Sequence, residues 1–199
     1  MRPNVYRLNQ FEVANKLAYF LWGSMPDEPH LEAASEGELG TSEQVSSQAE
    51  RMLASPRAAE RVQRFHGMWL GYHRLGSDTP IGAAMLSETN ALISRIVFED
   101  KSDYMELFSF DETWLNQDLA THYGLDAPSD AAGAWVSYGD SGRGGVFSHG
   151  TFLSVASKFG DTSPTQRGRL IRERIVCQPV NLPSADLNVN VDEEPTSPD

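Results

Sequence analysis

The chain has 199 residues, of which 40% are hydrophobic and 10% aromatic, and this composition is sufficient for a packed globular core. Its net charge of -12 argues against a broad surface for nucleic acid or anionic membrane, because both need clustered Lys and Arg. The single cysteine, Cys177, excludes an internal disulfide framework and cysteine-rich metal sites, and no apolar run reaches the roughly 18 residues that span a bilayer.

Helix signals dominate the first third of the chain. Asn9 is expected to cap an amphipathic helix of about 12 residues that ends at Gly23. A short helical turn follows at 30–34. Thr41 and Gln44 then have the spacing of a capping box, in which each side chain satisfies a free backbone amide at the start of a helix.

Two Ser/Thr-Pro pairs predict the next helix starts. Ser55-Pro56 opens a helix that ends at Gly71, and Thr79-Pro80 opens a long helix that ends near Asp100. Serine or threonine is a good N-cap, and proline suits the first helical position because the amide it lacks has no partner there.

The middle of the chain reads as two helices followed by a strand. Residues 102–124 are expected to form a short helix, a turn at Asp111 and a second helix that ends at Gly124. Residues 125–134 read as a linker. Trp135-Val-Ser-Tyr138 is the one convincing strand, because its side chains alternate between glycine-bounded ends.

The last part predicts two helices, at about 144–157 and 164–177, followed by an extended tail or linker without basic residues. Residues 143–174 carry six basic and two acidic side chains, so they form a positive segment in an acidic chain. The expected fold is mainly α, an irregular bundle of about seven to eight helices with at most one short β element and an extended C-terminal tail.

Helical phasing divides the arginines of the last helix. Arg167 and Arg174 project near the middle of an apolar arc that includes Cys177, so we expect both to be inward structural arginines paired with carboxylates. The alternative for Arg167 is an anion site, because it lies near the first turn, where free amides favour negative charge. Cys177 is expected to be buried, the alternative being a bond to a cysteine outside the chain.

Catalytic and metal motifs do not match. GVFSHG places Ser148 beside His149 between glycines, but its spacing is one residue longer than the nucleophile elbow of hydrolases. His66 and His73 are seven residues apart, with Gly71 between them, so they lack metal-ligand spacing. The chain has no C-x-x-C-H motif for covalent haem attachment. We therefore assign no catalytic residue and no metal ligand.

Several separated motifs resemble two bacterial families of unknown function. FEVANKLAYFLWGSMPDE, ERMLASPRAAERVQRFHGMWLG and DETWLNQDLATHYGL are similar to the family numbered 1592, and RGGVFSHGTFLSVASKFGDTSPTQRG is similar to the family numbered 1588, which normally follows it. The resemblance implies a helical domain at 7–124, a linker at 125–134, a smaller helical domain at 135–183 and an acidic extended tail or linker at 184–199. It also implies that the chain is a segment of a longer protein.

The expected function is that of an uncharacterised helical module in a larger exported bacterial protein, periplasmic or at the cell surface. Its role is structural or interactive, its partners are neighbouring domains of the same polypeptide, and it neither binds nucleic acid nor inserts into a membrane. No cofactor is expected in this segment, and the resemblance implies haem c on a neighbouring domain. The alternative is part of an extracytoplasmic redox or hydrolytic enzyme, with an anion-binding cleft lined by Arg143, Ser148, His149, Ser163 and Arg167.

Overall fold

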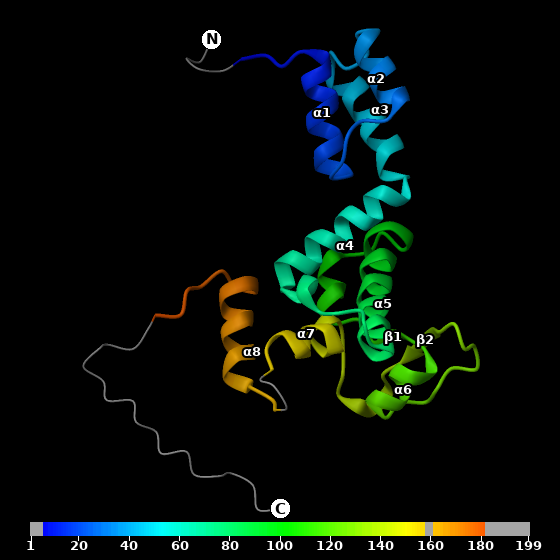
Figure 1. The fold of residues 1–199 in the computed structure, drawn as a ribbon, viewed down its shortest axis with the longest axis vertical. Coiled ribbons are helices and arrows are strands. Elements are labelled where there is room, and N and C mark those ends of the chain that lie inside the picture. The colour runs from blue at the N-terminus through cyan, green and yellow to red at the C-terminus, as the bar shows by residue number, and fades with distance from the viewer. Residues whose placement is uncertain (1–5, 158–160, 182–199) are drawn as a thin grey trace, which may run out of the picture. The chain divides into compact units, whose positions relative to one another are not determined.

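The computed structural model describes residues 6–157 and 161–181. The chain divides into two compact units, Met1–Val155 and Ala156–Asp199, and each is described by itself. Figure 1 shows the regular elements, which are α1 (Gln10–Leu21), α2 (Glu28–Ser35), α3 (Ser42–Leu53), α4 (Pro56–Leu70), α5 (Pro80–Ser94), β1 (Glu112–Leu115), α6 (Gln117–Tyr123), β2 (Ala134–Ser137), α7 (Gly150–Val155) and α8 (Pro164–Leu170). The prediction of a mainly α fold is confirmed.

The predicted helix starts of the first unit are confirmed by their caps. Asn9 accepts from the amide of Glu12 at 2.9 Å, and the Glu12 carboxylate accepts from the amide of Asn9 at 2.8 Å. Thr41 and Gln44 form the same reciprocal arrangement at the start of α3. These caps satisfy amides that have no partner inside a helix, which is why the boundaries follow from sequence.

Small residues let the first helices pack closely. Ala14 of α1 meets Ala33 and Ala34 of α2, and Ala18 packs with Met52 of α3. Buried Trp22 adds a directed contact, since its indole Nε1 donates to the carbonyl of Met52 at 2.9 Å. α1, α2 and α3 therefore form one group, from which α4 leads to α5 (Figure 1).

A two-stranded antiparallel sheet contains one strand that was not predicted. The predicted helix that ends at Gly124 forms as α6, and Glu112–Leu115, between the turn at Asp111 and α6, forms β1. Its side chains alternate between half-buried and buried, and Trp114 lies opposite Trp135 of β2. Asn116 then caps α6 by accepting from the amide of Leu119 at 2.9 Å. The expected linker 125–134 thus connects α6 to a strand that pairs with β1.

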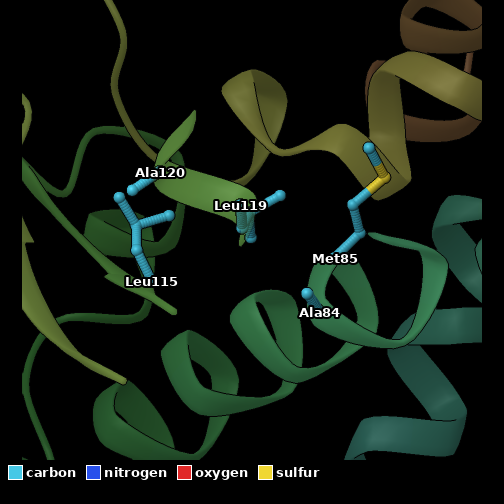
Figure 2. Close-up of a cluster of buried hydrophobic side chains, with 5 residues drawn as sticks. All are labelled: Ala84, Met85, Leu115, Leu119 and Ala120. Carbon is cyan, nitrogen blue, oxygen red and sulfur yellow. The ribbon is translucent and has the colours of Figure 1, made fainter. Parts of the chain in front are cut away.

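One apolar cluster fixes α6 and the sheet against α5. Figure 2 shows its five side chains, which are Ala84 and Met85 of α5, Leu115 of β1, and Leu119 and Ala120 of α6. Leu115, Leu119 and Ala120 are fully buried. This packing positions the inner face of α5, on which the candidate site is built.

A charged clamp holds the end of α5 to the sheet. α5 continues into a π turn at Arg95–Glu99. The Arg95 guanidinium pairs with Asp100 at 3.0 Å and with Glu112 at 2.7 Å, and it lies over the Trp135 ring at 4.5 Å from the centroid. Arg95 therefore bridges the helix end and both strands.

The second unit contains α8, which begins at Pro164 as predicted and continues into a π turn at Ile171–Ile175. The π turn shifts the helical phase, and this matters because the predicted apolar arc assumed regular α geometry. Arg174 is exposed. The prediction that Cys177 is buried is wrong: Cys177 is exposed and has a positive φ of 55°, because it follows the end of the helical turns. The predicted tail at 184–199 lies outside the described residues.

Within the described ranges, no helix combines the length and the apolar composition that a membrane span requires.

Candidate functional site

The five residues proposed for an anion-binding cleft belong to two different compact units. Arg143, Ser148 and His149 lie together in the first unit, in the segment that leads into α7, whereas Ser163 and Arg167 belong to the second unit. In the first unit, Arg143 and His149 belong to a largely buried group of polar side chains that we call the polar cluster, and Ser148 adjoins it. Its members are Glu88, Thr89, Thr113, Tyr123, Arg143, His149 and Thr151.

Ser148 closes the turn that carries Arg143. Its Oγ accepts from the amide of Gly144 at 2.8 Å and donates to the carbonyl of Gly144 at 3.0 Å. Both hydrogen-bonding capacities of the hydroxyl thus serve the local backbone. The Ser148 side chain therefore stabilises the backbone conformation of the loop.

Gly145 fits this turn tightly against the segment that precedes β1. Its φ is +53°, and its amide donates to the carbonyl of Phe110 at 2.8 Å. A Cβ atom at this position would lie 2.3 Å from the carbonyl carbon of Phe108, which is backbone and cannot move aside. The left-handed conformation and the close approach both require glycine.

Arg143 is held in the cluster by its guanidinium group. One terminal nitrogen donates to the carbonyl of Ser148, and the guanidinium carbon lies 3.9 Å from the ring centroid of Tyr123 and 5.8 Å from that of Tyr138. A cation over an aromatic face is attracted by the negative charge of the ring face. Arg143 thus supplies the positive charge beside the buried acid described next.

Glu88 is the buried acid at the centre of the polar cluster. Its side chain is fully buried on the inner face of α5, where Oε1 accepts from the Thr113 hydroxyl and Oε2 accepts from the Tyr123 hydroxyl, both at 2.6 Å. Burial raises the pKa of Glu88 to about 7, although the two hydroxyl donors and the nearby Arg143 act in the opposite direction.

Tyr123 links this acid to the start of α7. The same phenol oxygen that donates to Glu88 accepts from the amide of Gly150 at 2.7 Å. Burial, followed by the charge of Glu88, raises the pKa of Tyr123 well above its usual range, so the phenol stays protonated as a donor.

His149 approaches Glu88 from the other side. The imidazole is fully buried, its Nδ1 lies 3.0 Å from the Thr89 hydroxyl, and its Nε2 lies 3.7 Å from Oε1 of Glu88. Nε2 has no hydrogen-bond partner within the described residues. Burial, assisted by Arg143, lowers the pKa of His149 to about 3, so the imidazole is neutral near pH 7.

Glu88, Thr89 and Thr113 were not among the residues selected from sequence. One signal pointed to Glu88: it lies three residues after Met85 and four before Leu92, in phase with the apolar side chains of α5. A carboxylate at such a position must find buried partners. Those partners come from β1 and α6, which are distant in sequence, so their identity depended on the tertiary fold.

In the second unit, the backbone amide of Arg167 donates to the carbonyl of Ser163 at 3.1 Å, in the first turn of α8. Ser163 stands at the N-cap position of α8, is 6% exposed and makes no capping bond through its side chain. Arg167 is half-buried and donates to the Thr162 hydroxyl at 2.9 Å. On the exposed side of α8, Arg169 pairs with Glu173 at 2.8 Å.

Metal-ligating side chains do not gather in the parts of the chain that the structure describes. There, no group of three or more His, Cys, Asp or Glu is placed to hold a metal ion. The hydrogen bonds of the polar cluster join α5, β1 and α6 to the start of α7. Within the cluster, a buried carboxyl group and a buried imidazole lie 3.7 Å apart.

The fold and the polar cluster define a mainly helical module of unknown function, with a small sheet and a largely buried cluster of ionisable side chains. The chain belongs to the family PSD4, protein of unknown function (DUF1592), whose model matches residues 8–125. Residues 143–198 match the model of PSCyt3, protein of unknown function (DUF1588). The predicted family membership and order are thereby confirmed. Neither the curated proteins nor the solved structures gave a match.

The polar cluster joins the two matched segments. Glu88 and Tyr123 lie in the first match, whereas Arg143, His149 and Gly150 lie in the second. The contact between Glu88 and Tyr123 joins α5 to α6 within the first matched segment, and the contact between Tyr123 and Gly150 joins that segment to the second.

Proposed function

We propose that this chain is an interaction module of a larger exported bacterial multidomain protein, without a catalytic centre of its own. In this proposal a neighbouring domain of the same polypeptide packs onto an apolar face formed by α1, α3 and α4. The observation that carries it is a hollow lined almost entirely by apolar side chains, two of which are exposed aromatic rings.

The hollow has a volume of about 290 Å³ and is lined by Phe20, Leu21, Leu53, Ala58, Arg61, Val62 and Phe65. Phe20 is 74% exposed and Phe65 is 55% exposed. Large apolar side chains that gather in one exposed hollow mark an interaction surface, because their burial by a partner releases water from apolar area.

A second hollow adjoins the first and extends the face. Its volume is about 690 Å³, and it shares Leu53 and Val62 with the smaller one. Val97 and Phe98, in the π turn that follows α5, also line it. Two adjoining hollows along α4 suit an elongated apolar partner such as an amphipathic helix.

The charged side chains of α4 indicate which residues should border the apolar face of that partner. α4 carries Arg57, Arg61 and Arg64 against a single acid, Glu60. Arg61 also lines the hollow and donates through Nε to the carbonyl of Phe20 at 3.3 Å, which holds its charge at the rim. The partner we propose therefore presents an apolar helix face bordered by Asp or Glu.

The extracytoplasmic location and haem c on a neighbouring domain belong to the same proposal. Both are supported by the family resemblance described above. The absence of a C-x-x-C-H motif from this sequence is the reason for assigning covalent haem attachment to another domain.

A photo-cross-linking amino acid in place of Phe65, introduced into the full-length protein, tests the proposed partner. After irradiation and proteolysis, mass spectrometry should find position 65 joined to a peptide from another domain of the same polypeptide. The matched control is position 11, because Phe11 is also aromatic and 50% exposed but lies outside the hollow. Adducts that join position 65 only to a second copy of this chain, or equal yields at both positions, would contradict the proposal.

A further inference from the structure

We propose that Glu88 and His149 share one proton in the folded protein, with the proton on the carboxyl group and the imidazole neutral, so that folding transfers a proton from His149 to Glu88. This arrangement goes beyond the interaction role. It makes the junction between residues 143–151 and α5 insensitive to pH across a mildly acidic range.

Hydrogen-bond counting on the imidazole side assigns the tautomer. The Thr89 hydroxyl has a single proton, and it is placed to donate to the carbonyl of Met85 at 3.2 Å. The contact of 3.0 Å between Thr89 Oγ1 and His149 Nδ1 then needs Nδ1–H as the donor. Thr151, 2.7 Å away, supplies the second donor to the same oxygen. This assignment satisfies every contact of Thr89 at once.

In the neutral imidazole, this assignment leaves a lone pair on Nε2 of His149. That nitrogen is buried without a hydrogen-bond partner in the described part of the chain, and it lies 3.7 Å from Oε1 of Glu88. A carboxylic acid proton on Oε1 would meet the lone pair after a small movement of either side chain. A carboxylate at the same place would instead face the Nε2 lone pair. Both atoms would then be acceptors with no proton between them, and the contact would be repulsive.

The groups that face the pair agree with this proton position. Tyr123 from α6 and Tyr138 after β2 are phenols whose pKa values burial raises, so both stay neutral. Arg143 is the charged group that acts on both members of the pair: it favours a carboxylate on Glu88 and opposes an imidazolium on His149. Desolvation outweighs Arg143 at Glu88, where the pKa rises to about 7.

The direction of the pH dependence follows for each residue. The pKa of Glu88 is above its unfolded value of 4.5, so its contribution to stability is complete below pH 4.5 and is lost as pH rises through about 7. The pKa of His149 is below its unfolded value of 6.5, so its contribution is complete above pH 6.5 and is lost as pH falls towards about 3. Between pH 4.5 and 6.5 the two dependences cancel.

Single substitutions remove the cancellation and expose opposite slopes. Relative to the unaltered chain, the unfolding constant of Glu88→Gln should fall about tenfold per pH unit between roughly pH 5 and 6.5, because one proton is linked to folding there. That of His149→Gln should rise by about the same factor over the same range. The double variant should regain the pH profile of the unaltered chain. The controls are Glu60→Gln and His73→Gln, which alter exposed side chains.

Flat profiles of both single variants relative to the unaltered chain in this range would overturn the proposal, because they would show that no proton is linked to either residue alone. An ordinary ion pair, with Glu88 a carboxylate and His149 an imidazolium, is distinguished by the state of the ring in the unaltered chain, because the buried partner that is left in a single variant would itself lose its charge. Nitrogen-15 NMR of the histidines in the unaltered chain decides the question even if a variant does not fold. At pH 6 the ring of His149 should be the neutral Nδ1–H tautomer, and an imidazolium signal would also overturn it.

Discussion

The Tyr123 hydroxyl donates to Oε2 of Glu88 at 2.6 Å, and this one contact ties α6 to the inner face of α5. The same oxygen accepts from the amide of Gly150 at 2.7 Å. A phenol near the end of the PSD4 match thus satisfies both a buried carboxyl group and the first backbone amide of α7, which belongs to the PSCyt3 match. Two polar groups of different elements depend on this one side chain.

Tyr123→Phe should lower the free energy of unfolding by about 2 kcal/mol, because it leaves a buried carboxyl oxygen and a buried amide without their partner. It should also raise the pKa of Glu88 further, since Tyr123 is one of the donors that lower it. Urea unfolding at pH 6 measures the first effect. Tyr19→Phe is the control, because Tyr19 is 53% exposed and its hydroxyl can be hydrated. Equal stability of the two variants would contradict this role of Tyr123.

Gly145→Ala should destabilise the first unit by more than about 2 kcal/mol, because it adds a clash with backbone to the strain of a positive φ. The added Cβ atom would lie 2.3 Å from the Phe108 carbonyl carbon. Gly142→Ala separates the two contributions: its φ is +72°, but a Cβ atom there meets nothing within 4 Å. We expect about 1 kcal/mol for Gly142→Ala, the cost of the left-handed conformation alone. Thermal unfolding of both variants measures the difference, and equal losses would contradict a close approach at Gly145.

Local signals predicted much of this fold. Asn9, Thr41, Ser55 and Thr79 mark helix starts through hydrogen bonds to amides within three residues, so a sequence window contains both partners. Gly71 and Gly124 end helices for an equally local reason, since both adopt a positive φ. Such features depend little on the rest of the chain.

Features that depend on distant partners were missed. Glu112–Leu115 is a strand because Ala134–Ser137 pairs with it, and that pairing closes across α6. Glu88 tolerates burial because Thr113 and Tyr123, respectively 25 and 35 residues away in sequence, donate to it. Of the candidate site, Arg143 and His149 were selected from the sequence through their unusual segment, whereas Glu88 was not selected, because only its helical phase marks it and its partners are distant in sequence.

Arg143→Met should lower the free energy of unfolding by about 2 kcal/mol, because it removes a hydrogen bond to the Ser148 carbonyl and the cation over two aromatic rings. Arg143→Lys should recover little of this loss, since an ammonium group lacks the planar fork that stacks and donates together. Arg167→Met is the comparison, with an expected loss below about 0.5 kcal/mol, because its described bond is to the exposed Thr162. Denaturant unfolding of the three variants measures these stability losses. A larger loss for Arg167→Met than for Arg143→Met would contradict the conclusion that Arg143 contributes more to stability than Arg167.

Asp27→Asn should lower the free energy of unfolding by about 1 kcal/mol at pH 7, mainly through the lost ion pair, because asparagine still caps a helix. Asp27 accepts from Arg51 through both carboxylate oxygens, at 2.8 and 2.9 Å, and also caps α2 by accepting from the amide of His30 at 3.1 Å. The Arg51 hydrogen bonds hold the pKa of Asp27 below its usual value of 3.8.

Because that pKa is lower in the folded protein, the contribution of Asp27 is complete above pH 3.8 and is lost as pH falls through the folded value. The stability difference between Asp27→Asn and the unaltered chain should therefore be constant from pH 7 down to about 4 and shrink below it. Glu28→Gln is the matched control, since it removes a neighbouring carboxylate that is exposed at the start of the same helix without a described ion pair. Urea unfolding from pH 7 to pH 3 measures both variants. A difference that grows as the solution is acidified would show that the protonated form of Asp27, not the carboxylate, stabilises the contact between α2 and α3.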